Sequence, residues 1–134
     1  MMIEVNPTIK DMRDLLCTAI EGGISYWCND ECENVDIKRS EGWGGADFEK
    51  WWYVKLSLDT ACMSEDDTLK HFEVTPEIML EKFDAWMDYC KETMKWRWDQ
   101  WVDALTEDDL GGSCDAEDAD CFVQYCLFGE VVFG

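Results

Sequence analysis

The chain has 134 residues, a formal net charge of −20 at pH 7 and a hydrophobic content of 47% that includes eight Trp. This length suits one domain with a buried core, and so many aromatic residues argue against disorder. The charge makes nucleic acid and anionic membranes poor partners, because both would repel it. No run of about 20 apolar residues predicts a membrane span. The start of the sequence lacks the basic and apolar parts of a signal peptide, so we expect a cytoplasmic protein with reduced thiols.

The first half of the chain predicts one helix followed by three strands. Thr8 can cap a helix that runs to about Glu21, with Asp11 completing a capping box and the glycine pair at 22–23 ending the helix. Apolar and polar residues then alternate in three runs, at 35–38, 52–58 and 71–74. Such alternation indicates a short antiparallel meander with one face covered by helices.

Two further helices are predicted in the second half. Thr75 and Pro76 form a strong helix start, and an apolar stripe extends this helix to about Leu105. A last helix begins at Ser113 or Asp115 and ends at the glycine that follows residue 128.

Together these patterns predict a single α+β domain over residues 1–134, with about three helices packed on a small antiparallel sheet. The segment 131–133 could add a short edge strand. Trp86 and Trp96 fall off the apolar stripe of the long helix, and they either widen its buried face or include an exposed contact residue. We expect the core to include Trp52, Val54, Leu56, Phe83, Met87, Cys90, Trp101, Phe122 and Cys126.

Negative charge is concentrated toward the end of the sequence. From Trp98 onward there are ten carboxylates and neither Lys nor Arg. Carboxylates in the first turn of the last helix are explained by the helix dipole. Asp99, Asp103 and Glu107 are not, because they lie toward the C-terminal end of the long helix, where the dipole favours cations. Residues that go against the helix-dipole preference without a stabilising gain are often functional.

An acidic band around the corner between these two helices is the strongest candidate binding surface. Residues three and four apart on a helix lie about 5–6 Å from each other. Their carboxylates could therefore imitate the closely spaced phosphates of DNA. A solvated acidic face without a partner is the alternative. The predicted partner-binding residues are Asp99, Asp103, Glu107, Asp108, Asp109, Asp115, Glu117, Asp118 and Asp120.

Metal binding and catalysis have weaker support. Zinc could be held by Cys28, Cys32, Cys62 and His71, although no CxxC spacing supports it. Calcium could bind at 115–120, but that stretch lacks the central glycine and the distal glutamate of an EF-hand loop. The chain has one histidine, and no nucleophile motif accompanies it. We therefore expect no catalytic centre, no cofactor and no structural disulfide.

Two stretches of the chain resemble a group of small phage and prophage proteins. Residues 21–27 read EGGISYW, and residues 124–134 read QYCLFGEVVFG. Members of that group carry an EGG-x-x-YW segment and finish in Q-x-x-x-FGE-x-x-[YF]G. The resemblance implies a phage origin and assigns no residue a role. It favours a counter-defence protein by analogy, because small acidic phage proteins often inhibit DNA-binding host machinery.

One main hypothesis and two alternatives follow. We expect a phage-encoded inhibitor of the anti-CRISPR or anti-restriction type, which occupies the nucleic-acid channel of a basic protein in the host cytoplasm and binds no nucleic acid itself. The first alternative is a phage structural or assembly protein whose segment 131–133 pairs with another chain. The second is a small metal-binding module. A homodimer is a further possibility.

Overall fold

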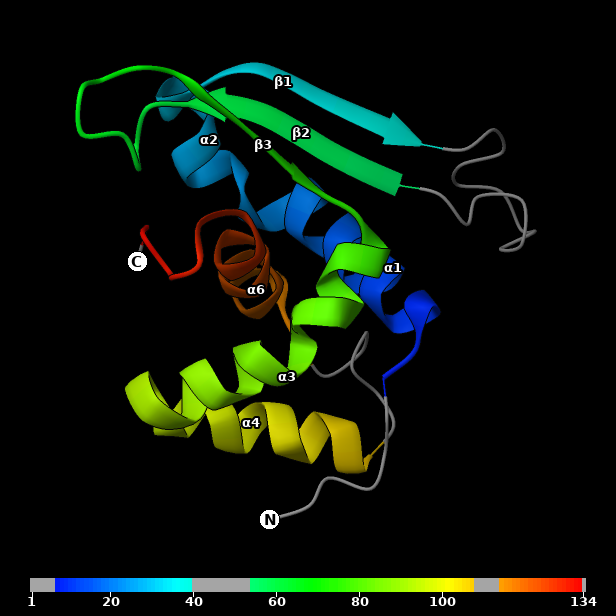
Figure 1. Ribbon diagram of the computed structural model, residues 1–134. Coiled ribbons are helices and arrows are strands. Elements are labelled where there is room, and N and C mark those ends of the chain that lie inside the picture. Colours follow the sequence, from blue (N-terminus) through cyan, green and yellow to red (C-terminus); the bar gives the residue numbers. More distant parts are fainter. Residues whose placement is uncertain (1–6, 40–53, 108–113, 134) are drawn as a thin grey trace.

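The structure is a computed structural model that describes residues 7–39, 54–107 and 114–133 (Figure 1). Within these residues the chain forms five α-helices, one π-helical turn and three strands. The predicted α+β class is confirmed, whereas the predicted number of about three helices is wrong. In chain order the elements are α1 (Ile9–Thr18), the π-helical turn η1 (Ala19–Gly23), α2 (Ser25–Glu31), β1 (Cys32–Arg39), β2 (Val54–Thr60), β3 (Lys70–Val74), α3 (Pro76–Thr93), α4 (Lys95–Thr106) and α6 (Ala116–Phe128).

The three strands form the predicted antiparallel sheet in the order β1-β2-β3. Leu56 of the central strand lies opposite Ile37 on one side and Val74 on the other. The inward residues of β2, Val54, Leu56 and Leu58, have no exposed surface. All described helices lie on one side of the sheet, with α6 in the middle of the molecule, α3 leading away from the end of β3 and α4 farthest from the strands (Figure 1).

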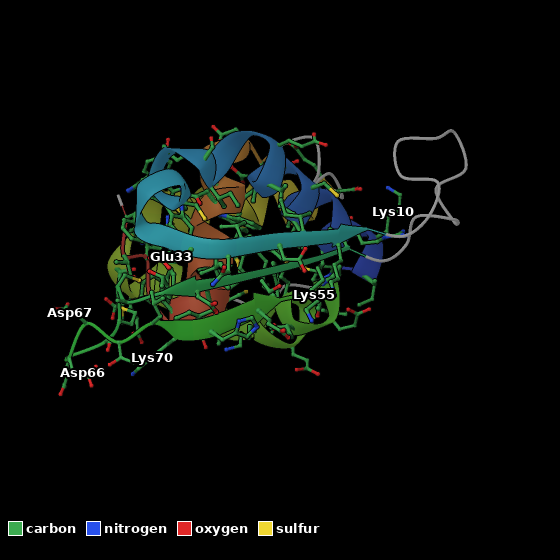
Figure 2. The ribbon with its side chains drawn as sticks, turned by 90° about the horizontal axis from the view of Figure 1, so that it is seen from above. Lys10, Glu33, Lys55, Asp66, Asp67 and Lys70 are labelled. Carbon is green, nitrogen blue, oxygen red and sulfur yellow. The ribbon has the colours of Figure 1, made fainter. Side chains whose placement is uncertain are left out.

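The outer face of the sheet carries charges of both signs. Figure 2 looks onto this face and shows Lys55 of β2 together with Glu33 of β1. Lys55 forms an ion pair of 3.0 Å with Glu73 on the neighbouring strand. Because cations and carboxylates share this face, it has no one-signed field.

The first predicted helix starts as expected but does not end where expected. Thr8 and Asp11 form the predicted capping box. The glycine pair does not stop the helix: Gly22 and Gly23 lie inside η1, and the chain continues as helical backbone into α2. The reason is a tertiary contact. A Cβ atom on Gly23 would lie 2.6 Å from the carbonyl oxygen of Ala116, so the glycine allows α6 to approach the turn closely.

The second predicted helix, from Thr75 to about Leu105, is in fact two helices. Thr75 is its N-cap, as predicted, and accepts a hydrogen bond from the backbone N–H of Ile78. The helix breaks at Met94, whose backbone has φ −145° and ψ 72°. The chain then reverses, so that α4 lies alongside α3 (Figure 1). The break contains neither Gly nor Pro, and the apolar stripe runs through it unchanged.

Aromatic rings fill the space between α3, α4 and α6. Trp86 stacks on Phe122 with ring centres 5.4 Å apart and meets Trp101 edge-on at 5.8 Å. Trp86 therefore widens the buried face of its helix, while Trp96 is 61% exposed. Trp52 lies outside the described residues. The other predicted core residues are buried: Val54, Leu56, Phe83, Met87, Cys90, Trp101, Phe122 and Cys126.

The segment 131–133 does not add the predicted edge strand. It folds back over α6 instead, and its backbone N–H groups donate to side chains. Val131 donates to the hydroxyl of Tyr89 at 3.0 Å, and Val132 and Phe133 donate to Oε1 of Gln124 at 3.0 and 2.8 Å. The backbone N–H groups of residues 132 and 133 therefore bond to a side-chain amide and not to the backbone of a neighbouring strand.

Candidate functional site

The predicted acidic band is present only in part. Asp108 and Asp109 lie outside the described residues. Asp118 and Asp120 are buried, with 2% and 0% of their surface exposed, so their carboxylates cannot face a partner and the prediction is wrong for both. The exposed members are Asp99, Asp103, Glu107, Asp115 and Glu117.

Three of the exposed carboxylates form a row along α4, which we call the α4 acidic row: Asp99, Asp103 and Glu107. Asp99 and Asp103 are one helical turn apart, and Glu107 caps the end of the helix. The last turn of α4 contains no basic residue, so Asp103 and Glu107 lie at the negative end of the helix dipole. Asp99 does not, contrary to the prediction, because the break at Met94 makes it the fifth residue of α4. No ion pair joins the row to any cation among the described residues.

The last cation of the sequence, Arg97, is directed into the protein. Only 3% of its surface is exposed. Its Nη1 donates to Oδ1 of Asp118, and its Nη2 lies 3.3 Å from Oε1 of Glu117. The ring of Trp96 covers the guanidinium at 4.4 Å. Arg97 therefore neutralises α6 and not the exposed end of its own helix, although it lies only two residues before Asp99 in the sequence.

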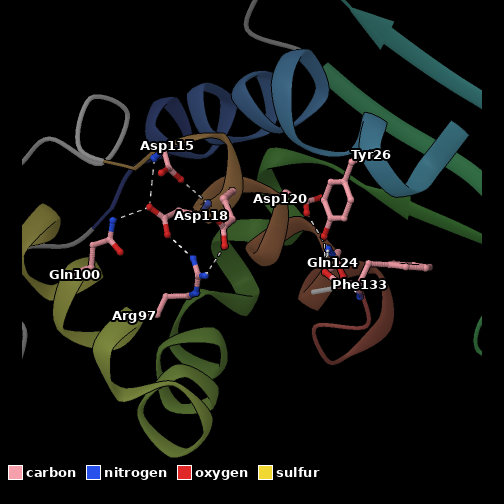
Figure 3. Close-up of polar contacts among 9 residues, drawn as sticks. Tyr26, Arg97, Gln100, Asp115, Asp118, Asp120, Gln124 and Phe133 are labelled. Atoms are coloured by element: carbon pink, nitrogen blue, oxygen red, sulfur yellow. Dashed lines mark hydrogen bonds and ion pairs between the residues drawn. The ribbon is translucent and has the colours of Figure 1, made fainter.

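Asp118 is an internal partner rather than a surface charge. It forms a capping box with Asp115, which is one of the two predicted caps of the last helix. Its Oδ2 also accepts a hydrogen bond of 2.8 Å from Nε2 of Gln100 (Figure 3). Burial raises the pKa of this carboxyl group, and the facing guanidinium of Arg97 acts in the opposite direction.

Asp120 organises a second network, which we call the tail network. Its two oxygens accept hydrogen bonds of 2.7 Å from Nε1 of Trp27 and 2.8 Å from Nε2 of Gln124. The carbonyl oxygen of Phe133 accepts from the hydroxyl of Tyr26 at 2.6 Å and from Gln124 at 3.0 Å (Figure 3). Burial raises the pKa of Asp120, while these N–H donors favour the ionised form.

The two stretches that carry the sequence resemblance meet in this network. Trp27 stacks on Phe133 with ring centres 4.8 Å apart and planes at 5°. Gly23 packs against Ala116 and Asp120 near the start of α6. These residues therefore have a structural role, because they join η1 and α2 to α6 and hold the segment 131–133 in place.

A pocket that the sequence did not reveal lies beside the tail network. Its volume is about 420 Å³. It is bordered by η1, the start of α2, the break between α3 and α4, the first turns of α6 and the segment 131–133. Apolar side chains such as Met94 and Val131 line it together with Tyr26, Arg97 and Glu117. No local sequence pattern could have predicted it, since five separate segments contribute to its walls.

The other candidate residues have ordinary environments. His71 lies on the outer sheet face with Nδ1 2.8 Å from Oδ1 of Asp59 and Nε2 2.9 Å from Oε1 of Glu73, and the carboxylates of Glu73 and Asp59 raise its pKa. Burial raises the pKa of the Cys90 and Cys126 thiols to about 12, so both are protonated at neutral pH. Among the described residues, no cluster of three or more His, Cys, Asp or Glu is arranged to hold a metal ion.

Comparisons with known proteins add no assignment. The chain matches no protein-family model, and neither the curated proteins nor the solved structures contain a match. None of the helices that the structure describes is long and apolar enough to cross a membrane.

Proposed function

We propose that this protein binds a basic nucleic-acid-binding protein through the α4 acidic row and excludes nucleic acid from it. By analogy with small acidic phage proteins, we propose that the partner is a bacterial defence protein, such as a CRISPR effector or a restriction enzyme. The observation that carries the proposal is the row itself: its three carboxylates are exposed and form no ion pair with a cation among the described residues, and Asp103 and Glu107 also oppose the helix dipole. Folding alone favours the opposite charge at this end of a helix.

The spacing of the row supports mimicry of a nucleic-acid backbone. Eight residues separate the first and last carboxylates, which corresponds to about 12 Å along a helix. One strand of DNA presents three to four phosphates over roughly that length, at about 3.4 Å each along the axis. The row therefore places one negative charge about every 6 Å, which is roughly half the linear charge density of a single strand, and a groove built for phosphates would attract it.

The position of the row also suits an interface. In Figure 1 α4 lies at the far side of the molecule from the sheet, with α3 as the labelled element beside it. The outer sheet face has paired charges of both signs, whereas no basic residue follows Arg97 in the sequence. A basic partner would be steered toward the α4 end of the molecule rather than the sheet end.

The test compares two variants that lose the same charge. One carries Asp99→Asn, Asp103→Asn and Glu107→Gln. The matched control carries Glu77→Gln, Glu81→Gln and Asp84→Asn, which are exposed positions on α3. Immobilised protein is used to capture partners from a bacterial lysate, and bound proteins are eluted with duplex DNA and identified by mass spectrometry.

We expect the wild type and the control to retain a basic nucleic-acid enzyme that DNA displaces. The α4 variant should lose at least about tenfold in association rate at low salt, and its rate should depend less on salt. Equal capture by both variants would contradict the proposal. Recovery of phage structural proteins alone, with no competition by DNA, would favour the assembly alternative instead.

A further inference from the structure

The strand β1 is an edge of the sheet with an open side. Among the described residues only β2 pairs with it. Every side chain from residue 33 to residue 38 is exposed, whereas no residue of the neighbouring strand β2 is. An edge strand presents a row of backbone N–H and C=O groups that another strand can bind. β1 can therefore accept a further strand.

Two apolar side chains of β1 are uncovered on the helix side of the sheet. Ile37 lies opposite Leu56, and residues directly opposite each other point to the same face. Leu56 has no exposed surface, but Ile37 is 38% exposed, and Val35, two residues earlier, is 43% exposed. A strand added beside β1 would cover both side chains if it carried an apolar residue on this face.

The charges on the other face of β1 favour a strand of complementary charge. Asp36 and Lys38 flank Ile37, and their side chains are 55% and 62% exposed. Oδ2 of Asp36 lies 3.8 Å from Nζ of Lys38, which is long for an ion pair. Lys38 also lies opposite Lys55 of β2, and like charges in this position are destabilising. A carboxylate on the open side of Lys38 would offset that repulsion.

A second copy of β1 supplies this charge pattern in one register. In a symmetric antiparallel pair one residue lies opposite itself, and the candidates at the straight end of β1 are Asp36, Ile37 and Lys38. The end before Asp36 is excluded, because the β1–β2 register shifts between Glu33 and Asp36. Pairing centred on Asp36 or on Lys38 places two like charges opposite each other. Pairing centred on Ile37 places Asp36 of each copy opposite Lys38 of the other.

We propose that β1 pairs with β1 of a second copy, antiparallel about Ile37, and joins the two three-stranded sheets into one. The two Ile37 side chains meet on the helix side, and four charges of alternating sign meet on the outer face. The interface is independent of the proposed function. In Figure 1 β1 lies on the side of the molecule away from α4, so the dimer leaves the α4 acidic row of each copy open.

The other edge strand, β3, is less suited to such pairing. Its central apolar residue, Phe72, already packs edge-on against Phe128 with ring centres 5.0 Å apart. Both ring nitrogens of His71 already contact carboxylates of their own chain, those of Asp59 at 2.8 Å and Glu73 at 2.9 Å. The groups that β1 leaves without close contacts are therefore occupied on β3.

Sedimentation equilibrium of the full chain measures the dimer. Pairing of one short strand is a small interface, so we expect a weak, concentration-dependent dimer. The net charge of −20 on each copy is screened at about 0.15 M salt, where the Debye length is about 8 Å. Asp36→Lys and Lys38→Asp each place like charges opposite each other, and each should weaken self-association at least about tenfold. Glu65→Lys, an equal change of charge at another exposed position, should dimerise like the wild type.

Mixing the two variants tests the charge pairing itself. When a chain carrying Asp36→Lys meets one carrying Lys38→Asp, every charge at the interface again lies opposite its complement. We expect an equimolar mixture to form heterodimers with nearly the wild-type affinity, and the double variant Asp36→Lys, Lys38→Asp to recover self-association. Recovery in the mixture cannot come from refolding of a damaged chain, and thermal unfolding of each variant checks the fold.

Cross-linking tests the register. Residues directly opposite each other in an antiparallel pair have Cα atoms about 4.5–5.5 Å apart, which suits a disulfide. With oxidised glutathione as the oxidant, Ile37→Cys should therefore give a covalent dimer. Val35→Cys should not, because the two copies of this position would be about 13 Å apart. The wild type, oxidised in the same way, controls for the eight native cysteines.

Each outcome bears on the inference. A monomer at every concentration up to about 1 mM, well above the range of stable specific complexes, would overturn it. A dimer that both single variants retain, or a mixture that stays monomeric, would also overturn it, and cross-linking at position 35 in place of 37 would refute the register. Loss in each single variant with recovery in the mixture would support it, whatever the lysate capture experiment shows for the α4 acidic row.

Discussion

Gln124 should be the most sensitive polar residue of the protein, because it makes four hydrogen bonds inside the tail network. Its Oε1 accepts from the backbone N–H groups of Val132 and Phe133, and its Nε2 donates to Asp120 and to the carbonyl oxygen of Phe133. Its side chain has no exposed surface. Gln124→Met keeps the volume and removes all four bonds.

The cost can be estimated bond by bond. The bond to the buried carboxylate of Asp120 contributes about 1.5–3 kcal/mol, because its loss leaves a charged acceptor with one donor fewer. The three bonds to the segment 131–133 contribute about 0.5–1.5 kcal/mol each when they are buried. This segment is only half-buried, so its backbone groups regain water once released. We therefore expect the free energy of unfolding to fall by about 3–4 kcal/mol.

Urea unfolding followed by tryptophan fluorescence measures this loss, and amide hydrogen exchange at Val132 and Phe133 reports release of the segment. Gln100→Met is the matched control, since it removes one amide bond to a buried carboxylate, that of Asp118. We expect it to cost about 1–2 kcal/mol. If Gln124→Met costs no more than the control, or if exchange at 132 and 133 is unchanged, the network does not hold the segment.

Two further predictions concern packing and pH. Gly23→Ala should lower the free energy of unfolding, measured in urea, by about 1–3 kcal/mol. The reason is that its Cβ would lie 2.6 Å from the carbonyl oxygen of Ala116. Gly22→Ala should leave this free energy nearly unchanged, because the nearest contact of its Cβ is 3.3 Å and alanine favours the helix. The raised pKa of His71 means that its protonated form adds stability below about pH 6.5, which is lost as pH rises through the folded-state value. The free energy of unfolding should therefore decline as the pH rises above about 6.5. His71→Gln should flatten that decline, and an unchanged slope would refute the role of this residue.

Local chemistry made several elements predictable from the sequence. The capping pair Thr8 and Asp11 and the Thr75-Pro76 start depend on residues three or fewer positions apart, and the structure confirms both. The alternation in β2 is likewise local, because one buried face suffices to specify it. Elements of this kind can be predicted without knowing the rest of the fold.

The features that the sequence did not predict depend on distant contacts. The break at Met94 follows from the packing of α4 along α3, and nothing in the residues at 93–95 requires it. Gly22-Gly23 looks like a helix stop, but its role is set by Ala116, more than 90 positions later. The burial of Asp120 depends on Trp27, 93 positions away, and charged residues are otherwise expected at the surface.

The charges at the two helix ends indicate that acidity at the end of α4 is a structural cost. Arg97 lies in the first turn of α4, on a different face from Asp99, and its guanidinium pairs with Asp118 and Glu117. The first turn of α6, where the dipole already favours carboxylates, receives the cation, and the end of α4, where the dipole opposes them, receives none. A chain under selection for stability alone would reverse that arrangement, because a cation in the last turn of α4 would be favourable. The observed distribution is the one expected if a cation from another molecule completes the row.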